Sequence, residues 1–435
     1  MRIRRMNIRV DLNRTVGKIK PMHGVGQPPL MSGKALSSDF HYLTEAGVPY
    51  SRLHDVGGRF GGNLFVDIPN IFRDFDADVD DPASYDFTFT DVLIKDLIEA
   101  GIEPYYRLGV TIENDAVIKS FRIDPPKDYN KWARICEHIV AHYLDGWADG
   151  FRYPITYWEI WNEPDDGLRV SEMWNGTPED YYRLYDVTAK HLKAVFGDRI
   201  KVGGYAATNL RAGLVPDQYQ DNPKRLYCAE FFKGFLDYIQ KSGAPLDFFS
   251  WHSYDRTAKT VPVAYWVREQ LDLHGFYGAE SHLNEWNPVH QARGTEHHSA
   301  EITAMMLGMQ KSPMDVMTIY DARRGGSAYS ALFDPYTYKP FHGYYALVAF
   351  DHLYALGSEV YTECDTEEVY AVAATNGTQH AIVISNISDH AKLDLHIEGV
   401  DLSHARYHVL DQARLLSWSP RVNAIEKNQV VLIEF

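Results

Sequence analysis

The stretch of sequence that decides the fold is Tyr157-Trp158-Glu159-Ile160-Trp161-Asn162-Glu163-Pro164-Asp165. Its first part is typical of a β-strand, because Trp158 and Ile160 alternate with Glu159 and Trp161. Pro164 ends the run, since proline lacks the backbone N–H that a strand needs, and this leaves Glu163 just beyond the strand. In barrels of alternating strands and helices, residues at the carboxyl ends of the strands carry the chemistry. Glu163 is therefore a candidate catalytic residue.

On both sides of this stretch, short apolar runs alternate with helical patterns. This rhythm predicts βα units and a parallel sheet. Eight such units close naturally into a (β/α)₈ barrel, often called a TIM barrel. We expect the eight strands at Lys20–Gly26, Tyr50–Val56, Ile102–Val110, Tyr157–Trp161, Ile200–Ala206, Leu246–Tyr254, Glu280–Glu285 and Val316–Asp321.

Three of the intervening helices have clear boundary signals. A helix over Asp91–Ala100 is expected to take Thr90 as its N-cap and to end at Gly101. Another is expected from Pro178, because Thr177 can cap it, proline suits the first helical position, and acidic residues follow in the first turn. A third, apolar nearly all round, covers Phe341–Leu356 and ends at Gly357.

After Gly357 the hydrophobic period changes from that of helices to that of strands. Leu393, Leu395 and Ile397 alternate with polar residues, and Asn376-Gly377 lies between two apolar runs as a hairpin signal. About five strands are expected here, and the alternating Met6, Ile8, Val10 and Leu12 supply another from the N-terminus. We therefore predict an α/β chain with a (β/α)₈ barrel over residues 15–357 and a small β-sandwich over residues 358–435, joined by residues 1–14.

Composition excludes several classes of protein. The chain has 435 residues with 43 Lys+Arg against 59 Asp+Glu, a formal net charge of −16, which disfavours nucleic acid as a partner. No apolar run is long enough to span a membrane, and three distant cysteines make no disulfide framework. The first residues lack the apolar core of a signal peptide. Localisation stays open between a secreted or periplasmic protein whose signal has been removed and a cytoplasmic one.

A second glutamate has the same setting as Glu163. Asn284-Glu285-Trp286-Asn287-Pro288 follows the apolar run Ala279–Leu283, so Glu285 is expected at the end of the seventh strand. The fourth and seventh strands face each other across a barrel mouth, and both carboxylates can therefore reach one point. Glycoside hydrolysis needs such a pair: carboxyl groups about 5–5.5 Å apart indicate retention of anomeric configuration, and about 6.5–9.5 Å inversion.

These motifs together resemble glycoside hydrolase family 39, a clan A family of β-xylosidases and α-L-iduronidases. The resemblance runs from about residue 20 to the end of the chain, and the Asn-Glu-Pro tract is specific for the clan. The segments that carry the resemblance are Ser51-Arg52-Leu53-His54-Asp55, Tyr85-Asp86-Phe87, Gly101-Ile102-Glu103-Pro104, Trp158–Pro164, Asp247–Tyr254 and Asn284-Glu285-Trp286.

The resemblance implies roles for individual residues. Glu163 is similar to the acid/base and Glu285 to the nucleophile of retaining members, and Asn162 to the residue that binds the sugar 2-hydroxyl. His54 and His252 match histidines that line the subsite nearest the bond, and Tyr254 an aromatic residue near the nucleophile. We further expect Arg52 to bind substrate or a catalytic carboxylate, and aromatic faces for sugar rings from Trp161, Trp251, Tyr254 and Trp286. Beyond His54 the sequence departs from the family, because Gly57–Gly62 replaces an aromatic-acidic segment at the pocket rim.

The leading hypothesis is a retaining glycosidase, a β-xylosidase by resemblance, that acts on plant or microbial glycans without a cofactor or a metal. Its partner is an oligosaccharide or glycoside, and its oligomeric state stays open. Burial and the charge of Glu285 should raise the pKa of Glu163. The alternatives are an endo-acting glycanase, a catalytically silent carbohydrate-binding barrel, a metal-dependent barrel hydrolase, and a uronic-acid glycosidase whose cation would be Arg52, Arg59, Arg107 or Arg323.

Overall fold

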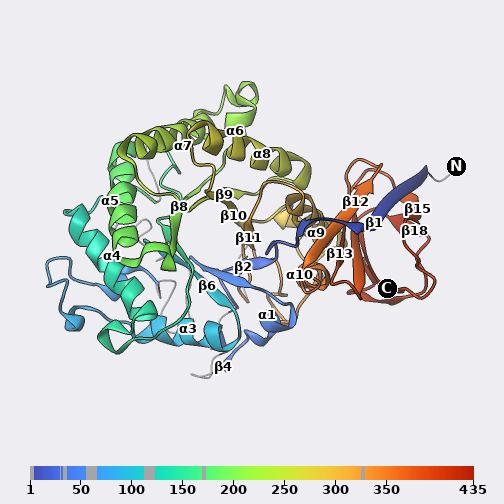
Figure 1. Cartoon of the computed structure of the whole chain (residues 1–435), viewed down its shortest axis with the longest axis horizontal. Helices are drawn as coiled ribbons and strands as arrows, with labels where there is room; N and C mark the ends of the chain where they lie inside the picture. Colours follow the sequence, from blue (N-terminus) through green and yellow to red (C-terminus); the bar gives the residue numbers. More distant parts are fainter. Residues whose placement is uncertain are drawn as a thin grey trace.

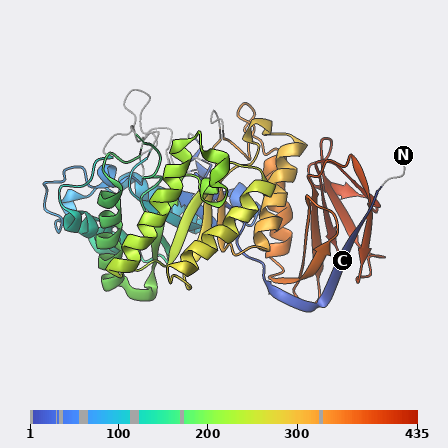
Figure 2. The same ribbon diagram turned by 90° about the horizontal axis from the view of Figure 1, so that it is seen from above.

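The computed structural model describes residues 4–29, 31–32, 37–54, 66–111, 123–168, 173–324 and 329–435. A closed barrel of eight parallel strands lies beside a nine-stranded sheet (Figures 1 and 2). All eight predicted barrel strands are confirmed. In chain order they are β2 (Gly24–Gly26), β5 (Tyr50–Leu53), β6 (Glu103–Leu108), β7 (Tyr157–Ile160), β8 (Lys201–Ala207), β9 (Phe248–Ser253), β10 (Glu280–Trp286) and β11 (Val316–Ile319). Strand β11 pairs with β2 and closes the barrel.

Helices surround this barrel, as Figure 1 shows. Their bounds are α1 (His41–Glu45), α2 (Ile68–Ile71), α3 (Thr88–Glu99), α4 (Tyr129–Leu144), α5 (Pro178–Phe196), α6 (Arg211–Leu214), α7 (Pro223–Ser242), α8 (Thr257–Leu273), α9 (Glu296–Gln310) and α10 (His342–Tyr354). A two-stranded hairpin of β3 (Met31–Ser32) and β4 (Ser37–Ser38) follows β2.

The predicted start of one helix is confirmed, and that of another is wrong. Helix α5 begins at Pro178 with the predicted cap, because the Thr177 hydroxyl accepts from the Asp180 N–H and the Asp180 carboxylate accepts from the Thr177 N–H. Helix α3 corrects the prediction: it begins at Thr88, so Thr90 lies inside the helix rather than at its cap. The Thr88 N–H donates to Asp86, which organises a helix start three residues before the predicted Asp91.

The second sheet combines the N-terminal strand with eight strands that follow the barrel. Strand β1 (Arg4–Lys18) pairs antiparallel with β12 and parallel with β15. Met6, Ile8 and Val10 are buried in a hydrophobic core that belongs to this sheet. The sequence predicted about five of the later strands and missed short ones such as β17 and β18. The set is β12 (Ser358–Cys364), β13 (Val369–Thr375), β14 (His380–Asn386), β15 (Lys392–Glu398), β16 (Arg406–Leu410), β17 (Ser417–Ser419), β18 (Ala424–Glu426) and β19 (Gln429–Glu434).

The sheet is mixed, with strand order β17-β16-β19-β14-β13-β12-β1-β15-β18. It is curled, which is consistent with the predicted β-sandwich. Helices α9 and α10 of the barrel pack against β13 and β14. The Ser385 hydroxyl, from β14, donates to the Ala300 carbonyl of α9 at 2.7 Å. Among the described residues, no helix combines the length and the apolar character that crossing a membrane requires.

Candidate active site

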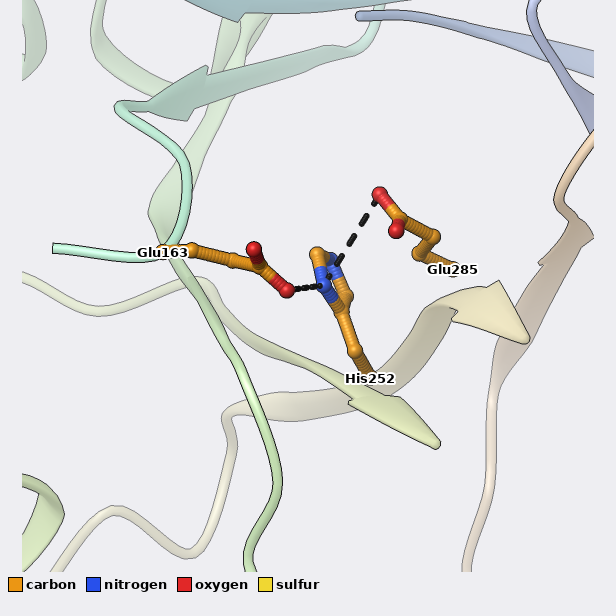
Figure 3. Close-up of side chains that lie close together, drawn as sticks. All are labelled: Glu163, His252 and Glu285. Atoms are coloured by element: carbon orange, nitrogen blue, oxygen red, sulfur yellow. Dashed lines mark hydrogen bonds and ion pairs between the residues drawn. The ribbon is translucent and has the colours of Figure 1, made fainter. Parts of the chain in front are cut away.

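Glu163 lies three residues beyond the end of β7, in a backbone turn fixed from both sides. The Trp161 N–H donates to the Leu108 carbonyl of β6 at 2.8 Å, and the Glu163 N–H approaches the Tyr205 and Ala206 carbonyls of β8 at 3.2 and 3.1 Å. Trp161 and Glu163 both have positive φ angles, 75° and 46°. Such conformations are costly for residues other than glycine and persist where the surroundings hold them. The neighbouring strands therefore direct Glu163 toward the barrel mouth (Figure 3).

Glu285 lies at the end of β10 and is 7% exposed. Both of its carboxylate oxygens accept hydrogen bonds, one from the residue that follows β9 and the other from a residue of β5. The Tyr254 hydroxyl donates to Oε1. The Arg52 guanidinium donates to Oε2 through Nη1 at 3.2 Å. Donors on both oxygens stabilise the ionised carboxylate and fix its orientation.

His252, from β9, lies between the two glutamates (Figure 3). A hydrogen bond of 2.7 Å joins its Nδ1 to Oε1 of Glu163, and the same nitrogen is 3.8 Å from Oε2 of Glu285. One oxygen of Glu163, one of Glu285 and a ring nitrogen of His252 all lie within 4.8 Å of one another. The structure thus brings together the two predicted carboxylates and one of the two predicted histidines.

Beneath these residues, Glu159 of β7 organises the floor of the site. Its carboxylate accepts from Nε of Arg52 at 2.8 Å, from the Ser250 hydroxyl at 2.6 Å and from the Asn284 amide at 2.5 Å. Arg52 also donates through Nη2 to Oδ1 of Asn162 at 2.6 Å. The buried guanidinium therefore links Glu159, Asn162 and Glu285 and fixes their positions relative to one another.

The sequence analysis did not single out Glu159, Asp165 or Asp166. A signal for Glu159 existed, because a carboxylate inside a fully apolar strand has to be paired when the strand is buried, and Arg52 occupies a similar setting. Asp165 is fully buried and accepts hydrogen bonds from the Thr208 backbone N–H and hydroxyl. Asp166 pairs with Lys224 of α7 at 2.5 Å. These contacts join elements that are distant in the sequence, so local patterns do not reveal them.

Burial raises the pKa of Glu163 to about 8, and the negative charge of Asp166 adds to the rise. The positive charges of Arg52, Lys224 and Arg225 oppose it. The prediction of a raised pKa through burial is confirmed, although the second cause is Asp166 and not the expected Glu285. Glu163 is therefore protonated at neutral pH.

Burial also raises the pKa of Glu285, and the charge of Glu163 adds to this effect. His252, Arg52 and the hydrogen bond from Tyr254 lower it. The pKa of His252 falls to about 4, mainly through burial, so its ring is neutral at neutral pH. A protonated Glu163, a neutral imidazole and a carboxylate held by two donors make the site able to donate a proton on one side and attack on the other.

A metal ion could in principle take ligands from Glu163, His252 and Glu285. The surroundings oppose this, since Arg52 places a positive charge against Glu285 and both oxygens of that carboxylate already accept hydrogen bonds. A divalent cation would have to displace these donors and bind beside a guanidinium. The donor set therefore fits paired carboxylate chemistry better than a metal centre.

The other residues predicted for the site lie in different surroundings. His54 is buried near the guanidinium groups of Arg107 and Arg52; burial is the main cause of its lowered pKa, with contributions from both. Tyr254 is half-buried and contacts Glu285. The loop Gly57–Gly62 and Arg59 lie outside the described residues.

The three tryptophans expected to face a sugar ring lie in the core of the structure. Trp251 and Trp286 are fully buried in the main hydrophobic core, and Trp161 is 2% exposed. The Trp251 and Trp161 indoles donate to the Ser281 hydroxyl and the Met173 carbonyl. These indoles pack in the core, and their use against a sugar ring stays a prediction. Among the four predicted aromatic residues, Tyr254 alone contacts a predicted catalytic carboxylate.

A closed (β/α)₈ barrel with two glutamates meeting at its mouth defines the class: a barrel of the glycoside hydrolase type. The family model described as glycosyl hydrolases family 39 matches residues 6–274, more than half of the chain. The chain belongs to this family of O-glycosyl hydrolases.

Individual relatives agree with the family. The chain is 24% identical to a β-xylosidase of Caldicellulosiruptor saccharolyticus over 88% of this chain and 78% of that protein. It is 25% identical to a β-xylosidase of Geobacillus stearothermophilus over 50% of this chain, a match that spans only 40% of that relative's length.

Solved structures show the same fold. The alignment with a glucosidase from Croceicoccus marinus covers 100% of this chain and 99% of the glucosidase chain, with a TM-score of 0.77 and 21% identity. A family 39 β-xylosidase from Caulobacter crescentus covers 99% of both chains, with a TM-score of 0.69 and 21% identity.

Proposed function

We propose that this chain is a retaining glycosidase in which Glu163 is the acid/base and Glu285 the nucleophile. The observation that carries the proposal is the meeting of the two side chains, whose nearer oxygens lie within 4.8 Å of each other. Such a close approach supports the carboxyl separation of retaining enzymes, roughly 5–5.5 Å, over the roughly 6.5–9.5 Å at which inverting enzymes hold a water molecule.

In the first step, Glu163 donates its proton to the leaving oxygen while Glu285 attacks the anomeric carbon. The raised pKa of Glu163 keeps that proton available at neutral pH. Arg52 and Tyr254 hold the Glu285 carboxylate in one orientation for attack. Asn162, whose carbonyl oxygen is held by Arg52, presents its amide nitrogen to the sugar 2-hydroxyl.

In the second step, water cleaves the glycosyl ester on Glu285. Esterification removes the negative charge of Glu285, which lowers the cost of ionising Glu163. Glu163, now without its proton, accepts one from the attacking water, and the sugar leaves with its original anomeric configuration.

We propose that the glycone is a neutral sugar, and that the preferred substrate is a β-D-xyloside. Two relatives are named β-xylosidases. Arg59 lies outside the described residues, and the other three arginines considered for a uronic acid are paired with buried carboxylates: Arg52 with Glu159 and Glu285, Arg107 with Asp67 at 2.7 Å, and Arg323 with Asp321 at 3.0 Å. These pairs compensate the cationic charge that a sugar carboxylate would require, so the described part of the site favours an uncharged glycone.

The test is turnover of 4-nitrophenyl β-D-xyloside, beside the matching glucoside, arabinoside and glucuronide. We expect the wild-type chain to release a β-configured product, seen by NMR before mutarotation. E163Q and E285Q should each reduce kcat by about 10³-fold or more while circular dichroism stays unchanged. Azide should restore turnover to E163A, with a β-glycosyl azide as the product. An α-configured product, or full activity in either variant, would overturn the assignment, and preference for the glucuronide would overturn the neutral glycone.

A further inference from the structure

Gln27 and Arg107 are two of the buried polar side chains near the barrel mouth that are only partly satisfied. Gln27, directly after β2, is 1% exposed; its Nε2 donates to the Tyr320 hydroxyl at 2.8 Å, whereas Oε1 has no hydrogen-bond partner among the described residues. Arg107, on β6, is fully buried; its Nη2 donates to Asp67 and to the Thr111 hydroxyl. Its Nε and Nη1 find no partner within the same described ranges.

Gln27 and Arg107 flank the strand that carries Arg52 and His54. Strand β5 pairs with β2 on one side and with β6 on the other. The Gln27 N–H donates to the Arg52 carbonyl at 3.1 Å. Arg107 directly follows Tyr106, which pairs with Leu53, so Arg107 lies level with His54. After burial, its charge is the largest contribution to the lowered pKa of that histidine. The two side chains thus belong to one wall of the mouth, built by β2, β5 and β6, while Glu285 and His252 come from β10 and β9.

A buried donor or acceptor without a partner has lost its hydrogen bonds to water and gained none in return, so native structures rarely keep one without a reason. The two groups are complementary, because Oε1 of Gln27 requires a donor and the N–H groups of Arg107 require an acceptor. A sugar hydroxyl supplies both. Asp67 compensates the charge of Arg107, which makes a neutral hydroxyl a better partner than a carboxylate.

We propose that Gln27 and Arg107 are specificity-determining residues that bind the glycone hydroxyls remote from the cleaved bond, at C3 and C4. This inference rests on the proposed function, which assigns the anomeric carbon to Glu163 and Glu285 and the 2-hydroxyl to Asn162. The hydroxyls at C3 and C4 then remain to be bound, and the wall that contains Gln27, Arg107 and His54 provides the groups that bind them. Gln27 was not predicted as part of the site, and Arg107 was considered only as the cation for a uronic acid, because neither belongs to a strand-end carboxylate motif.

The test compares the effect of each protein variant on kcat/KM for the parent substrate with its effect for substrates that lack one hydroxyl. The variants are Q27M, which keeps the side-chain length and removes the amide, and R107K, which keeps the charge opposite Asp67 and removes the Nε and Nη1 donors. The substrates are 4-nitrophenyl β-D-xyloside and its 3-deoxy and 4-deoxy analogues, which share one leaving group. An exposed glutamine provides the control variant Q218M.

We expect each variant to lower kcat/KM for the parent xyloside by about 10- to 100-fold. For the analogue that lacks the hydroxyl in question, the same variant should have an effect at least fivefold smaller. Q218M should change none of the values. A purely structural role would lower kcat/KM by one factor for all three substrates, and that result, or unchanged kcat/KM for the parent, overturns the proposal.

The proposed function is judged separately, by wild-type turnover and by its loss in E285Q. If the wild-type chain prefers another neutral aryl glycoside of the panel, the comparison uses the 3-deoxy and 4-deoxy analogues of that glycoside. Uniform losses across those analogues overturn the inference while the two-glutamate assignment stands.

Discussion

Asp166 follows Glu163 by three residues, and its backbone N–H donates to the Glu163 carbonyl at 3.1 Å. The turn places a second carboxylate near the proposed acid, and Lys224 pairs with that carboxylate. The two charges act on Glu163 in opposite directions, since Asp166 raises its pKa and Lys224 lowers it. The pH dependence of the reaction should therefore respond to each in turn.

D166N should lower the pKa of Glu163, so the alkaline limb of kcat/KM, set near pH 8, should move to lower pH. We expect a shift on the order of a few tenths of a pH unit to one unit. K224M should move the same limb upward, because it removes a positive charge and leaves Asp166 uncompensated. Both limbs are read from pH profiles on an aryl xyloside. Shifts of the same sign in the two variants would show that the pair does not act on Glu163 through its charge.

Tyr254 acts on the other carboxylate. Its hydroxyl donates to Glu285 and lowers the pKa of that group against the effect of burial. Y254F should therefore raise the pKa of Glu285 and move the acidic limb of kcat/KM to higher pH, with about a tenfold or larger loss at the optimum. The alkaline limb, which reports Glu163, serves as the internal control. An unmoved acidic limb would contradict the role of this hydroxyl.

At the scale of elements, the sequence predicted what depends on local pattern. The strands around Glu163 and Glu285 and the cap of α5 follow from alternation, from Pro164 and from Thr177 with Asp180. Hydrophobic runs identified all eight barrel strands because each is buried on both faces. The predicted start of α3 was wrong because the Asp86 side chain, upstream of Thr90, organises the first turn.

The sequence could not predict what depends on tertiary contact. Gln27 and Arg107 have no local signature, and their position beside His54 follows only from the barrel register. The burial of the tryptophans was unpredicted for a related reason, since an indole near a strand end is equally suited to a sugar and to the core. The packing of Trp251 and Trp286 in the main core depends on tertiary contacts that residue spacing does not reveal.

At the scale of the whole molecule, Val372, Val383 and Leu432 of the nine-stranded sheet belong to the main hydrophobic core, which the sheet shares with the barrel, and a second core lies within the sheet alone. Ile8 of β1 is fully buried in the core of the sheet, where it lies opposite Cys364 and Ile397 on the two neighbouring strands. The chain's first strand therefore contributes to the stability of the sheet without contributing a residue to the proposed catalytic pair.

I8A should destabilise the protein by about 2–5 kcal/mol, as expected when a large buried aliphatic side chain is removed. Urea unfolding followed by fluorescence measures the loss, and R9A, at an exposed neighbouring position, is the matched control. At temperatures where I8A is folded, kcat/KM should equal that of the wild type. A loss of kcat/KM in folded I8A would mean that the sheet helps to shape the barrel mouth.

The most direct test of the two-glutamate account is covalent trapping with 2,4-dinitrophenyl 2-deoxy-2-fluoro-β-D-xyloside. The fluorine slows both steps, and the good leaving group allows the first to proceed, so the glycosyl ester accumulates. We predict one fluoroxylosyl group per chain, carried by Glu285 in the peptide mapped by mass spectrometry, and no label in E285Q. A label on another residue, or steady turnover of ordinary xylosides with no covalent species under these conditions, would contradict the account.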